Sequence, residues 1–435
     1  MSKEKPQILV LSSVDPHRGP AVIAEDQYKR LKKAGYDVDF MTLYAVEGHP
    51  EYIYVYKNQT ERRRTLTAVL RKITDHNRFV ARHRYRDPQS AFSYRKETNV
   101  LISTKDIVRA IKKKYDVVEV FFWQEMLTFK SIDAIYDKLH CLFIFMCVDY
   151  SPMAGGCHFT GNCKNFETGC GYCPGIGSNK LNDFTRFNVN YRKQVCEKIK
   201  PVVCCNGYME TFFDRSYLFK DYPRRVRTYF TLDLNHFCEL DRMESRKEFG
   251  IQQSGKFVLL FGSQSLSDER KGVSYLLKAL KMLYDKLNIE ERDKILLVLA
   301  GKSIDEIKDK LCFEYKYLGY VKAELLPMMY AAADVFLSPS VNDAGPSMVN
   351  QSLACGTPVV SFEMGTALDY VKGKNTGYCA SLRDAEDFAR GIEKIFRLSE
   401  PDYYAMRKEC RQVSEDLSSE ERDLNMFKDI LNKYL

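Results

Sequence analysis

The chain has 435 residues, of which 45% are hydrophobic and 29% are charged, and it carries a net charge of +8. This length is too great for one hydrophobic core and suits two globular domains. The composition excludes a low-complexity protein, and the longest apolar run, near CLFIFMCV, is too short to span a membrane. The beginning, MSKEKPQILVLSSV, has no secretory h-region, so we expect a cytoplasmic protein.

Short apolar runs alternate with helical patterns along the whole chain. QILVLSSV precedes a helical stretch over 20–33, and YDVDFMTLY, YDVVEVFFW, CLFIFMCVD and PVVCCN follow. The second half contains KFVLLFGS, KILLVLAG, EYKYLGY, ADVFLSPS and TPVVSF. Runs this uniformly apolar indicate strands buried on both faces, and therefore parallel sheets covered by helices. The sequence predicts an α/β protein with two doubly wound, Rossmann-like domains that face a cleft.

We expect the first domain over 1–228 and the second over 229–400, joined near YPRRVRTYFTLDLNHF. The last segment, 401–435, has the pattern of a charged helix. In this fold class a terminal helix often returns to the first domain, so we assign it there.

The positive charge is concentrated in the stretch 57–97. It holds twelve Lys and Arg against four Asp and Glu, which accounts for the whole net charge of the chain. Three interpretations compete: a solvated helical face, a patch for anionic lipid or a lipid-linked phosphate, and a nucleic-acid patch. No stacking platform or nucleic-acid motif accompanies the charge, so we expect no nucleic-acid partner.

Two corners of the second domain suit an anion. In FGSQSLSDERKG, a strand ends at Gly262 and a loop with Arg270 and Lys271 leads into a helix. In NDAGPSMVNQ, a loop leads into a helix whose first turn carries Ser347 and Met348. A helix N-terminus offers unpaired N–H groups and partial positive charge. Two such corners in one domain favour a nucleoside diphosphate as the ligand.

Residues 256–380 resemble the nucleotide-binding domain of retaining glycosyltransferases of the GT-B fold, the class called family four. The resemblance rests on FGSQSLSDERKG, YLGYVKAELLPMMYAAADVFLSPS, DAGPSMVNQSLACGTPVVSFEMGTALDYV and NTGYCA. In the first domain, RGPAVIAEDQYKRLKKAGYDV is also similar to the family. The stretch CVDYSPMAGGCHFTGNCKNFETGCGYCPGI, within an insertion over 150–182, resembles one found in members that build bacterial surface polysaccharides.

The resemblance implies a role for each matching residue. Lys271 and Arg270 would neutralise the sugar diphosphate, and Asp343, the first position of an E-x7-E pattern, would face the donor sugar. Asp149 would orient a sugar hydroxyl. The remaining expected donor-site residues are Gly19, Gly262, Ser263, Gly345, Pro346, Ser347, Met348 and Gln351, with Gln351 near the ribose and Gly19 near the diphosphate or acceptor. Catalysis would need no metal cofactor.

The sequence departs from the family pattern in three places. The second carboxylate of the E-x7-E pattern is Gln351, which can hydrogen-bond but brings no charge. The arginine that many members place after the strand glycine is Ser263. The His-Asp pair of many members reads Val148-Asp149, so no histidine lies there to move a proton.

Four cysteines, Cys157, Cys163, Cys170 and Cys173, lie within seventeen residues. In a reducing compartment four thiols suit a tetrahedral structural zinc better than disulfides. Paired disulfides and unligated thiols remain alternatives. A four-thiolate site would staple the glycine-rich insertion and take no part in catalysis.

The resemblance implies an enzyme of class EC 2.4. It would move a sugar from a nucleotide donor to a glycan or lipid-linked acceptor in cell-surface polysaccharide biosynthesis. We expect it to bind peripherally to the inner face of the membrane through residues 57–97. The alternative is a non-catalytic homologue that binds nucleotide sugar as a partner or regulator, motivated by Val148 and Gln351. Sugar-nucleotide epimerases share the two-domain architecture and form a third hypothesis. A zinc-dependent nucleic-acid protein is a fourth, and its binding to DNA or RNA would weaken steeply as the salt concentration rises.

Overall fold

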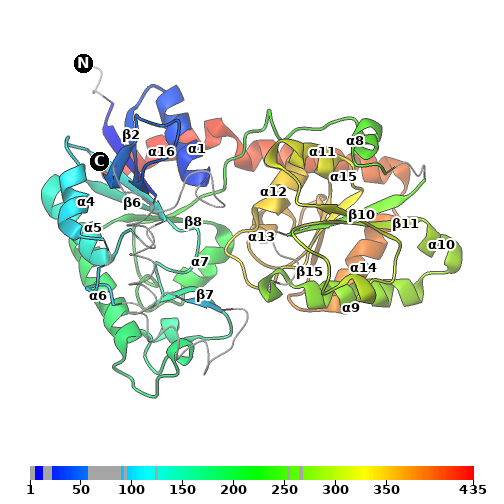
Figure 1. Cartoon of the computed structure of the whole chain (residues 1–435), viewed down its shortest axis with the longest axis horizontal. Helices are drawn as coiled ribbons and strands as arrows, with labels where there is room; N and C mark the ends of the chain where they lie inside the picture. Colours follow the sequence, from blue (N-terminus) through cyan, green and yellow to red (C-terminus); the bar gives the residue numbers. More distant parts are fainter. Residues whose placement is uncertain are drawn as a thin grey trace. The chain divides into compact units, whose positions relative to one another are not determined.

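The computed structural model describes residues 5–12, 22–56, 90–92, 96–100, 102–122, 126–251, 255–263 and 268–435. The chain divides by its internal contacts into two compact units. The first unit consists of Met1–Cys205, Met209–Thr228 and Leu424–Leu435, and the second of Asn206–Tyr208 and Tyr229–Asp423. Each unit contains one parallel sheet with helices around it (Figure 1).

Within the described ranges, the sheet of the first unit has seven parallel strands in the order β3-β2-β1-β5-β6-β8-β9. The strands are β1 (Gln7–Ser12), β2 (Asp37–Tyr44), β3 (Ile53–Tyr56), β5 (Val117–Phe122), β6 (Leu142–Met146), β8 (Val202–Cys205) and β9 (Arg225–Arg227). The strand order reverses between β1 and β5, and doubly wound sheets bind ligands near such a switch point. Gly19 lies outside the described residues, in the segment that follows β1.

The helices of the first unit are α1 (Val22–Lys33), α4 (Thr104–Ala110), α5 (Phe129–Leu139), α6 (Phe184–Ile199) and, from Met209 onward, α7 (Gly207–Phe213). The last twelve residues, part of α16 (Glu420–Tyr434), also belong to this unit. Phe427 and Ile430 of α16 are buried in the same cluster as Ile8 and Phe40. The end of the chain therefore completes the core of the first unit.

The insertion of the first unit contains little regular structure. β4 (Ser90–Phe92) pairs antiparallel with β7 (Cys157–Thr160), and two 3-10 turns follow, η2 (Asn165–Glu167) and η3 (Pro174–Ile176). The basic stretch 57–97 lies outside the described residues except for Ser90–Phe92 and residues 96 and 97. Its lipid-binding interpretation therefore stays a prediction.

The sheet of the second unit, in the part of the chain that the structure describes, has six parallel strands in the order β12-β11-β10-β13-β14-β15. The strands are β10 (Phe257–Gly262), β11 (Ile295–Ala300), β12 (Tyr315–Gly319), β13 (Val335–Ser338), β14 (Val359–Phe362) and β15 (Gly377–Ala380). Here the order reverses between β10 and β13. All six residues of β11 are buried, as its unbroken apolar run predicts.

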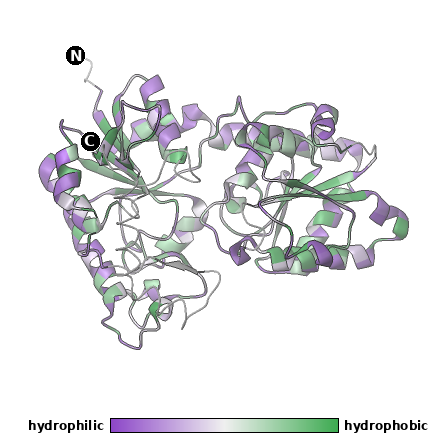
Figure 2. Cartoon of the chain, viewed as in Figure 1, coloured by the Kyte–Doolittle hydropathy of each residue, from purple (hydrophilic) through white to green (hydrophobic). Residues whose placement is uncertain are grey.

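Helices cover both faces of this second sheet. α9 (Val273–Lys286) and α14 (Ala385–Phe396) lie on one face, while α11 (Leu326–Ala331), α12 (Ser347–Ala354) and α15 (Glu400–Ser418) lie on the other (Figure 1). The shorter helices are α8 (Arg242–Glu248), α10 (Ile289–Asp293) and α13 (Ala367–Tyr370), and the 3-10 turns are η4 (Glu269–Lys271), η5 (Lys308–Lys310) and η6 (Ala323–Leu325). The strands are largely hydrophobic, whereas the helices carry both kinds of residue (Figure 2). Two doubly wound parallel sheets confirm the predicted fold class.

The described helices include none with the length and apolarity that crossing a membrane requires.

Candidate active site

The first corner of the candidate site follows β10 in the second unit. The amide of Ser263 donates to the carbonyl of Ala300, 3.0 Å away, which extends the pairing of β10 with β11 by one residue. After a segment outside the described residues, Asp268 caps η4 by accepting from the amide of Arg270 at 3.1 Å. Gly272 then begins α9 with a φ of +70°. A Cβ there would lie 1.7 Å from the Pro339 oxygen, so only glycine lets the two loops approach.

The second corner follows β13, the neighbour of β10 across the switch point. The amide of Val341 donates to the carbonyl of Arg270 at 2.8 Å, which ties the two corners together. Because both loops leave the carboxyl ends of adjacent parallel strands, their side chains meet at one edge of the sheet. The structure therefore brings the two predicted anion-binding corners into contact.

Lys271 and Asp343 form the central contact of the site. Nζ of Lys271 lies 2.5 Å from Oδ2 of Asp343, and the amide of Gly345 donates to Oδ1 at 3.1 Å. Burial opposes ionisation of Asp343, but Lys271, the Gly345 amide and the charge of Arg270 together lower the pKa of this carboxyl below its usual value. Asp343 is therefore an anion at neutral pH, held beside a cation.

Arg270 lies beside this pair and has a carboxylate partner of its own. Its guanidinium donates to Asp268 at 2.6 Å, and its side chain is 21% exposed. Two cations, Arg270 and Lys271, thus precede α9, and each is matched by one carboxylate.

The N-terminus of α12 is the third part of the site. Its N-cap, Pro346, offers no side-chain cap, and nothing in the described residues accepts a hydrogen bond from the amides of Ser347 and Met348. Ser347 is exposed, while the Met348 side chain reaches under Gly262, where an added Cβ would lie 2.9 Å from its terminal carbon. Such a helix end, with donors directed outward, suits an anion.

Gly345 and Gln351 have defined environments within the same unit. A Cβ on Gly345 would lie 2.7 Å from the Phe230 ring, so this position too favours glycine. The Oε1 atom of Gln351 accepts from the hydroxyl of the buried Tyr330 at 2.9 Å. The structure therefore groups nine predicted residues around the carboxyl ends of β10 and β13: Gly262, Ser263, Arg270, Lys271, Asp343, Gly345, Pro346, Ser347 and Met348, with Gln351 one turn further along α12.

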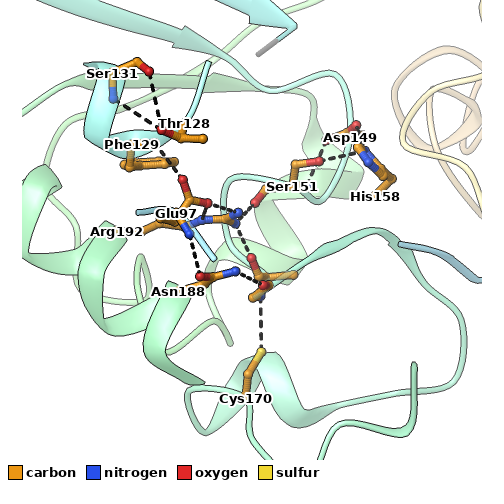
Figure 3. A network of polar contacts seen from close by, with 12 residues as sticks. Glu97, Thr128, Phe129, Ser131, Asp149, Ser151, His158, Cys170, Asn188 and Arg192 are labelled. Atoms are coloured by element: carbon orange, nitrogen blue, oxygen red, sulfur yellow. Dashed lines mark hydrogen bonds and ion pairs between the residues drawn. The ribbon is translucent and has the colours of Figure 1, made fainter. Parts of the chain in front are cut away.

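Asp149 belongs to the first unit, three residues after the end of β6. Its Oδ1 accepts from the amide of Ser151 at 2.8 Å, and its Oδ2 lies 3.0 Å from Nδ1 of His158 (Figure 3). Only 10% of its side chain is exposed. Asp149 is therefore held in a fixed orientation by its neighbours.

The four insertion cysteines line one cavity of the first unit. They share it with residues 154–156, Thr160, Asn165 and Thr185. The Sγ atom of Cys170 accepts from the amide of Gly155 at 3.3 Å, and no disulfide joins any of the four cysteines in the described residues. Burial raises the pKa of Cys170 to about 11 and that of Cys173 to about 12. No group of three or more metal-ligating side chains is arranged to hold an ion in the described residues, so structural zinc stays a prediction.

Two residues of these sites escaped sequence reasoning. Asp268 pairs with Arg270 and caps η4, and the preference of helix N-caps for aspartate is a signal that could have found it. His158 contacts Asp149, and nothing in the sequence joins the two residues.

The chain is similar to known glycosyltransferases in the second unit. Residues 241–413 match the family model described as glycosyl transferases group 1. An uncharacterised glycosyltransferase of Methanocaldococcus jannaschii is 25% identical over 169 residues, which are 38% of this chain and 41% of the relative. The D-inositol 3-phosphate glycosyltransferase of Geodermatophilus obscurus is 28% identical over 176 residues, 38% of each chain. The match thus spans about two fifths of these relatives.

Two solved structures cover nearly the whole chain. Sucrose-phosphate synthase from Thermosynechococcus elongatus aligns over 99% of both chains with a TM-score of 0.65 and 16% identity. Anabaena HepE in complex with UDP and glucose aligns over 98% of this chain and 100% of its own, with a TM-score of 0.60 and 13% identity. At these identities the likeness shows the fold alone, and that fold is GT-B.

The two doubly wound parallel sheets define the GT-B fold. Residues 241–413 are similar in sequence to the group 1 glycosyl transferases.

Proposed function

We propose that this protein is a retaining glycosyltransferase that moves a sugar from a nucleoside-diphosphate donor to an acceptor. The observation that carries the proposal is the Lys271–Asp343 ion pair beside the uncapped start of α12. A cation and outward-directed amides suit a diphosphate, and an oriented carboxylate suits a sugar hydroxyl. The match of residues 241–413 to the group 1 glycosyl transferases supports the same reaction class.

In this proposal the diphosphate lies against Lys271, Arg270 and the first turn of α12. Gly262 leaves room for the Met348 side chain, so the start of α12 can lie close to the end of β10. Asp343 faces the sugar, Gln351 lies near the ribose through its amide, and Gly19 approaches from the segment after β1. Asp149 orients a sugar hydroxyl.

The reaction breaks the bond between the anomeric carbon and the phosphate oxygen, and the electron pair leaves with the diphosphate. The negative charge on the diphosphate is greater in the transition state than in the bound donor. It is therefore stabilised more strongly there by Lys271, Arg270 and the α12 amides. The acceptor oxygen bonds to the same face of the anomeric carbon, and its proton passes to the departing phosphate oxygen. We propose that these groups of the chain suffice without a catalytic metal ion.

The proposed acceptor is a glycan or a lipid-linked sugar of the cell surface. One relative is named O-antigen chain mannosyltransferase B, from Escherichia coli, and is 32% identical over 133 residues, 29% of this chain and 33% of its own. The basic stretch 57–97 would hold the protein peripherally at an anionic membrane surface by charge attraction.

We also propose that the four insertion cysteines bind a structural zinc ion. Their arrangement around one cavity and the hydrogen bond from the Gly155 amide to Cys170 support this proposal. Four thiolates make a closed tetrahedral shell, so the ion would stabilise the insertion and leave no open position for substrate.

Turnover is the test of the proposed function. Purified protein is incubated with UDP-glucose, UDP-N-acetylglucosamine or GDP-mannose and a lipid extract of the cells that make it, and release of nucleoside diphosphate is measured. We expect release from one donor, reduced at least about a hundredfold in Lys271→Ala, since one charge-assisted contact to a developing anion contributes roughly 3 kcal/mol. Lys281→Ala is the matched control, because Lys281 lies on α9, is 62% exposed, and contacts Asp285 and the Tyr284 ring of its own helix. Donor binding without turnover would favour a non-catalytic homologue instead.

A further inference from the structure

Asp334 lies at the amino end of β13 and is contacted from three directions. Its Oδ2 accepts from the amide of Val258 in β10 and from Nη2 of Arg246 in α8, each at 2.6 Å. Nη2 of Arg242, also in α8, contacts its Oδ1. The hydroxyl of Tyr403 in α15 donates to the Asp334 carbonyl at 2.8 Å. This residue thus joins two helices to the amino ends of β10 and β13, at the sheet edge opposite to the candidate donor site.

A third guanidinium, that of Arg407, belongs to the same group. Tyr403 and Arg407 are four residues apart on α15, so they lie on the same face of that helix. Cζ of Arg242 lies 5.9 Å from the centroid of the Tyr403 ring, which brings Arg242 to this face too. We call Arg242, Arg246 and Arg407 the arginine cluster.

The arginine cluster has more positive charge than its neighbours balance. Arg242 and Arg246 share the carboxylate of Asp334, whereas Arg407 has neither an ion pair nor a hydrogen bond in the part of the chain that the structure describes. Three guanidinium groups around one carboxylate leave a surplus of two positive charges.

The surplus charge affects the arginines themselves. Burial and the charge of Arg407 lower the pKa of Arg242. Burial and the charges of Arg242 and Arg407 lower the pKa of Arg246 to about 10. Like charges disfavour the charged form of a group, so an anion beside these arginines would lower the free energy of the cluster.

Two donors of the arginine cluster have no partner. Nη1 of Arg407 and Nε of Arg242 are buried and make no hydrogen bond to any described residue. Buried donors in folded proteins are nearly always satisfied by protein, by water or by an ion. The Arg242 side chain is 35% exposed and Arg407 is partly exposed, so a small anion can reach both guanidinium groups.

We propose that Arg242 and Arg407 bind a phosphate group, with Arg246 adding positive charge and Asp334 and Tyr403 holding Arg242 in place. A guanidinium donates two parallel N–H bonds, a geometry that matches phosphate oxygens. A phosphate group carries close to two negative charges at pH 7.5, which balances the surplus of the cluster. The group can belong to inorganic phosphate or to a lipid headgroup, since both present the same oxygens.

This phosphate site is separate from the donor site of the proposed function. β10 begins beside the arginine cluster at Phe257 and ends at Gly262 in the donor site, a length of six residues or roughly 20 Å. None of the three arginines has a part in the proposed transfer of sugar. The inference therefore does not depend on that activity.

Variants at Arg407 test the site, because this side chain leaves no partner behind when it is removed. Arg407→Gln removes the charge, and Arg407→Lys keeps the charge but loses the planar fork. Lys408→Gln is the matched control, since it removes one charge from an exposed position of α15 that lies over the Tyr404 ring. Each variant is also made together with Lys271→Ala, which weakens phosphate binding at the donor site.

Calorimetric titration with inorganic phosphate, in Tris chloride at constant ionic strength, measures the dissociation constant. We expect the affinity to fall at least about tenfold in Arg407→Gln, because a hydrogen bond between charged groups is lost. Arg407→Lys should retain part of it, and Lys408→Gln should equal the wild type. In buffer without phosphate, Arg407→Gln should melt no lower than the wild type, because it relieves repulsion and breaks no contact.

A second arm distinguishes the two sources of the phosphate group. Sedimentation with vesicles of phosphatidylcholine, with and without phosphatidic acid, measures binding of the headgroup. Titration by inorganic phosphate that depends on Arg407 would support a soluble anion. Sedimentation with phosphatidic acid that is lost in Arg407→Gln but not in Lys408→Gln would support a lipid headgroup.

The inference is overturned if neither measurement depends on Arg407. Equal phosphate affinity and equal sedimentation in the wild type and Arg407→Gln would show that the arginine cluster binds no phosphate group. A lower melting temperature of Arg407→Gln in that case would assign Arg407 a structural role. Failure of the protein to bind nucleotide would contradict the proposed function and leave these outcomes as they are.

Discussion

Lys271 and Asp343 meet at 2.5 Å although 72 residues separate them in the chain. Lys271 ends η4 in the loop after β10 and Asp343 follows β13, so the pair marks the point where the strand order of the second sheet reverses. At this place Lys271 can bind the diphosphate of a sugar nucleotide, and Asp343 can bind its sugar.

The ion pair predicts a pH-dependent contribution to stability. The folded-state pKa of Asp343 is lowered, so its contribution is present at pH values above the unfolded pKa, near 3.8, and is lost as the pH falls through the folded pKa. We expect the melting temperature of the wild type to exceed that of Asp343→Asn by a constant amount between pH 5 and about pH 7, and the difference to shrink below about pH 4. A difference that is flat down to pH 3 would show that the pair does not form.

The close approach of the two loops predicts a severe effect of Gly272→Ala. A methyl group would meet the Pro339 oxygen, and the left-handed backbone adds strain of about 1–2 kcal/mol. Gly373→Ala is the control, because Gly373 has a similar φ of +74° and no atom within 4 Å of the added carbon. By calorimetry, the free energy of unfolding of Gly272→Ala should be lower than that of Gly373→Ala by at least about 2 kcal/mol. Equal losses of stability in the two variants would mean that backbone strain alone acts.

The buried pair of Glu97 and Arg192 predicts a large cost when one partner is removed. Both side chains are at most 8% exposed, so Arg192→Met leaves a buried carboxylate without its counter-charge, which costs about 3–5 kcal/mol. Arg109→Met is the control, since that arginine is 78% exposed and its pair contributes within about 1 kcal/mol. Denaturation can be followed by the fluorescence of the single tryptophan of the chain. Equal losses in the two variants would contradict the buried pair.

The cysteine cluster predicts one zinc ion per chain. Protein purified from zinc-supplemented medium should contain it, and Cys170→Ser should lose it, while Cys312→Ser, in the second unit, should retain it. Metal content by mass spectrometry is the measurement. Wild-type protein that contains no metal and whose four insertion cysteines react as free thiols would favour unligated cysteines. Metal-free protein in which these four cysteines do not react in a thiol titration would favour disulfides.

Sequence reasoning predicted the long buried strands but not the short edge strands. The central strands are mostly apolar, and β11 is an unbroken apolar run, ILLVLA, because helices cover both faces of its sheet. The missed strands of the two parallel sheets, β3, β9 and β15, lie at sheet edges, are three or four residues long and include polar or aromatic residues, so neither period nor length distinguishes them from loops. The antiparallel pair β4 and β7 was also missed.

The candidate site was predictable where a local motif carries it. Glycines, cations and a helix start lie close together in FGSQSLSDERKG and in NDAGPSMVNQ, so each corner could be read from its own residues. The contacts that join distant segments could not. Neither the bond from Val341 to the Arg270 carbonyl nor the approach of His158 to Asp149 has a signature in spacing, because each depends on how the strands are ordered in the sheet or on how the insertion folds.

The most direct test is a thermal-shift panel with UDP, GDP, ADP and dTDP and their sugars, with and without EDTA. A ligand at a hundred times its dissociation constant adds about 2.7 kcal/mol, which moves a melting midpoint by several degrees. The account predicts that one nucleotide raises the midpoint irrespective of EDTA, that Lys271→Ala abolishes the shift and that Lys281→Ala preserves it. No shift with any nucleotide, or an equal shift in Lys271→Ala, would contradict the assignment of the donor site.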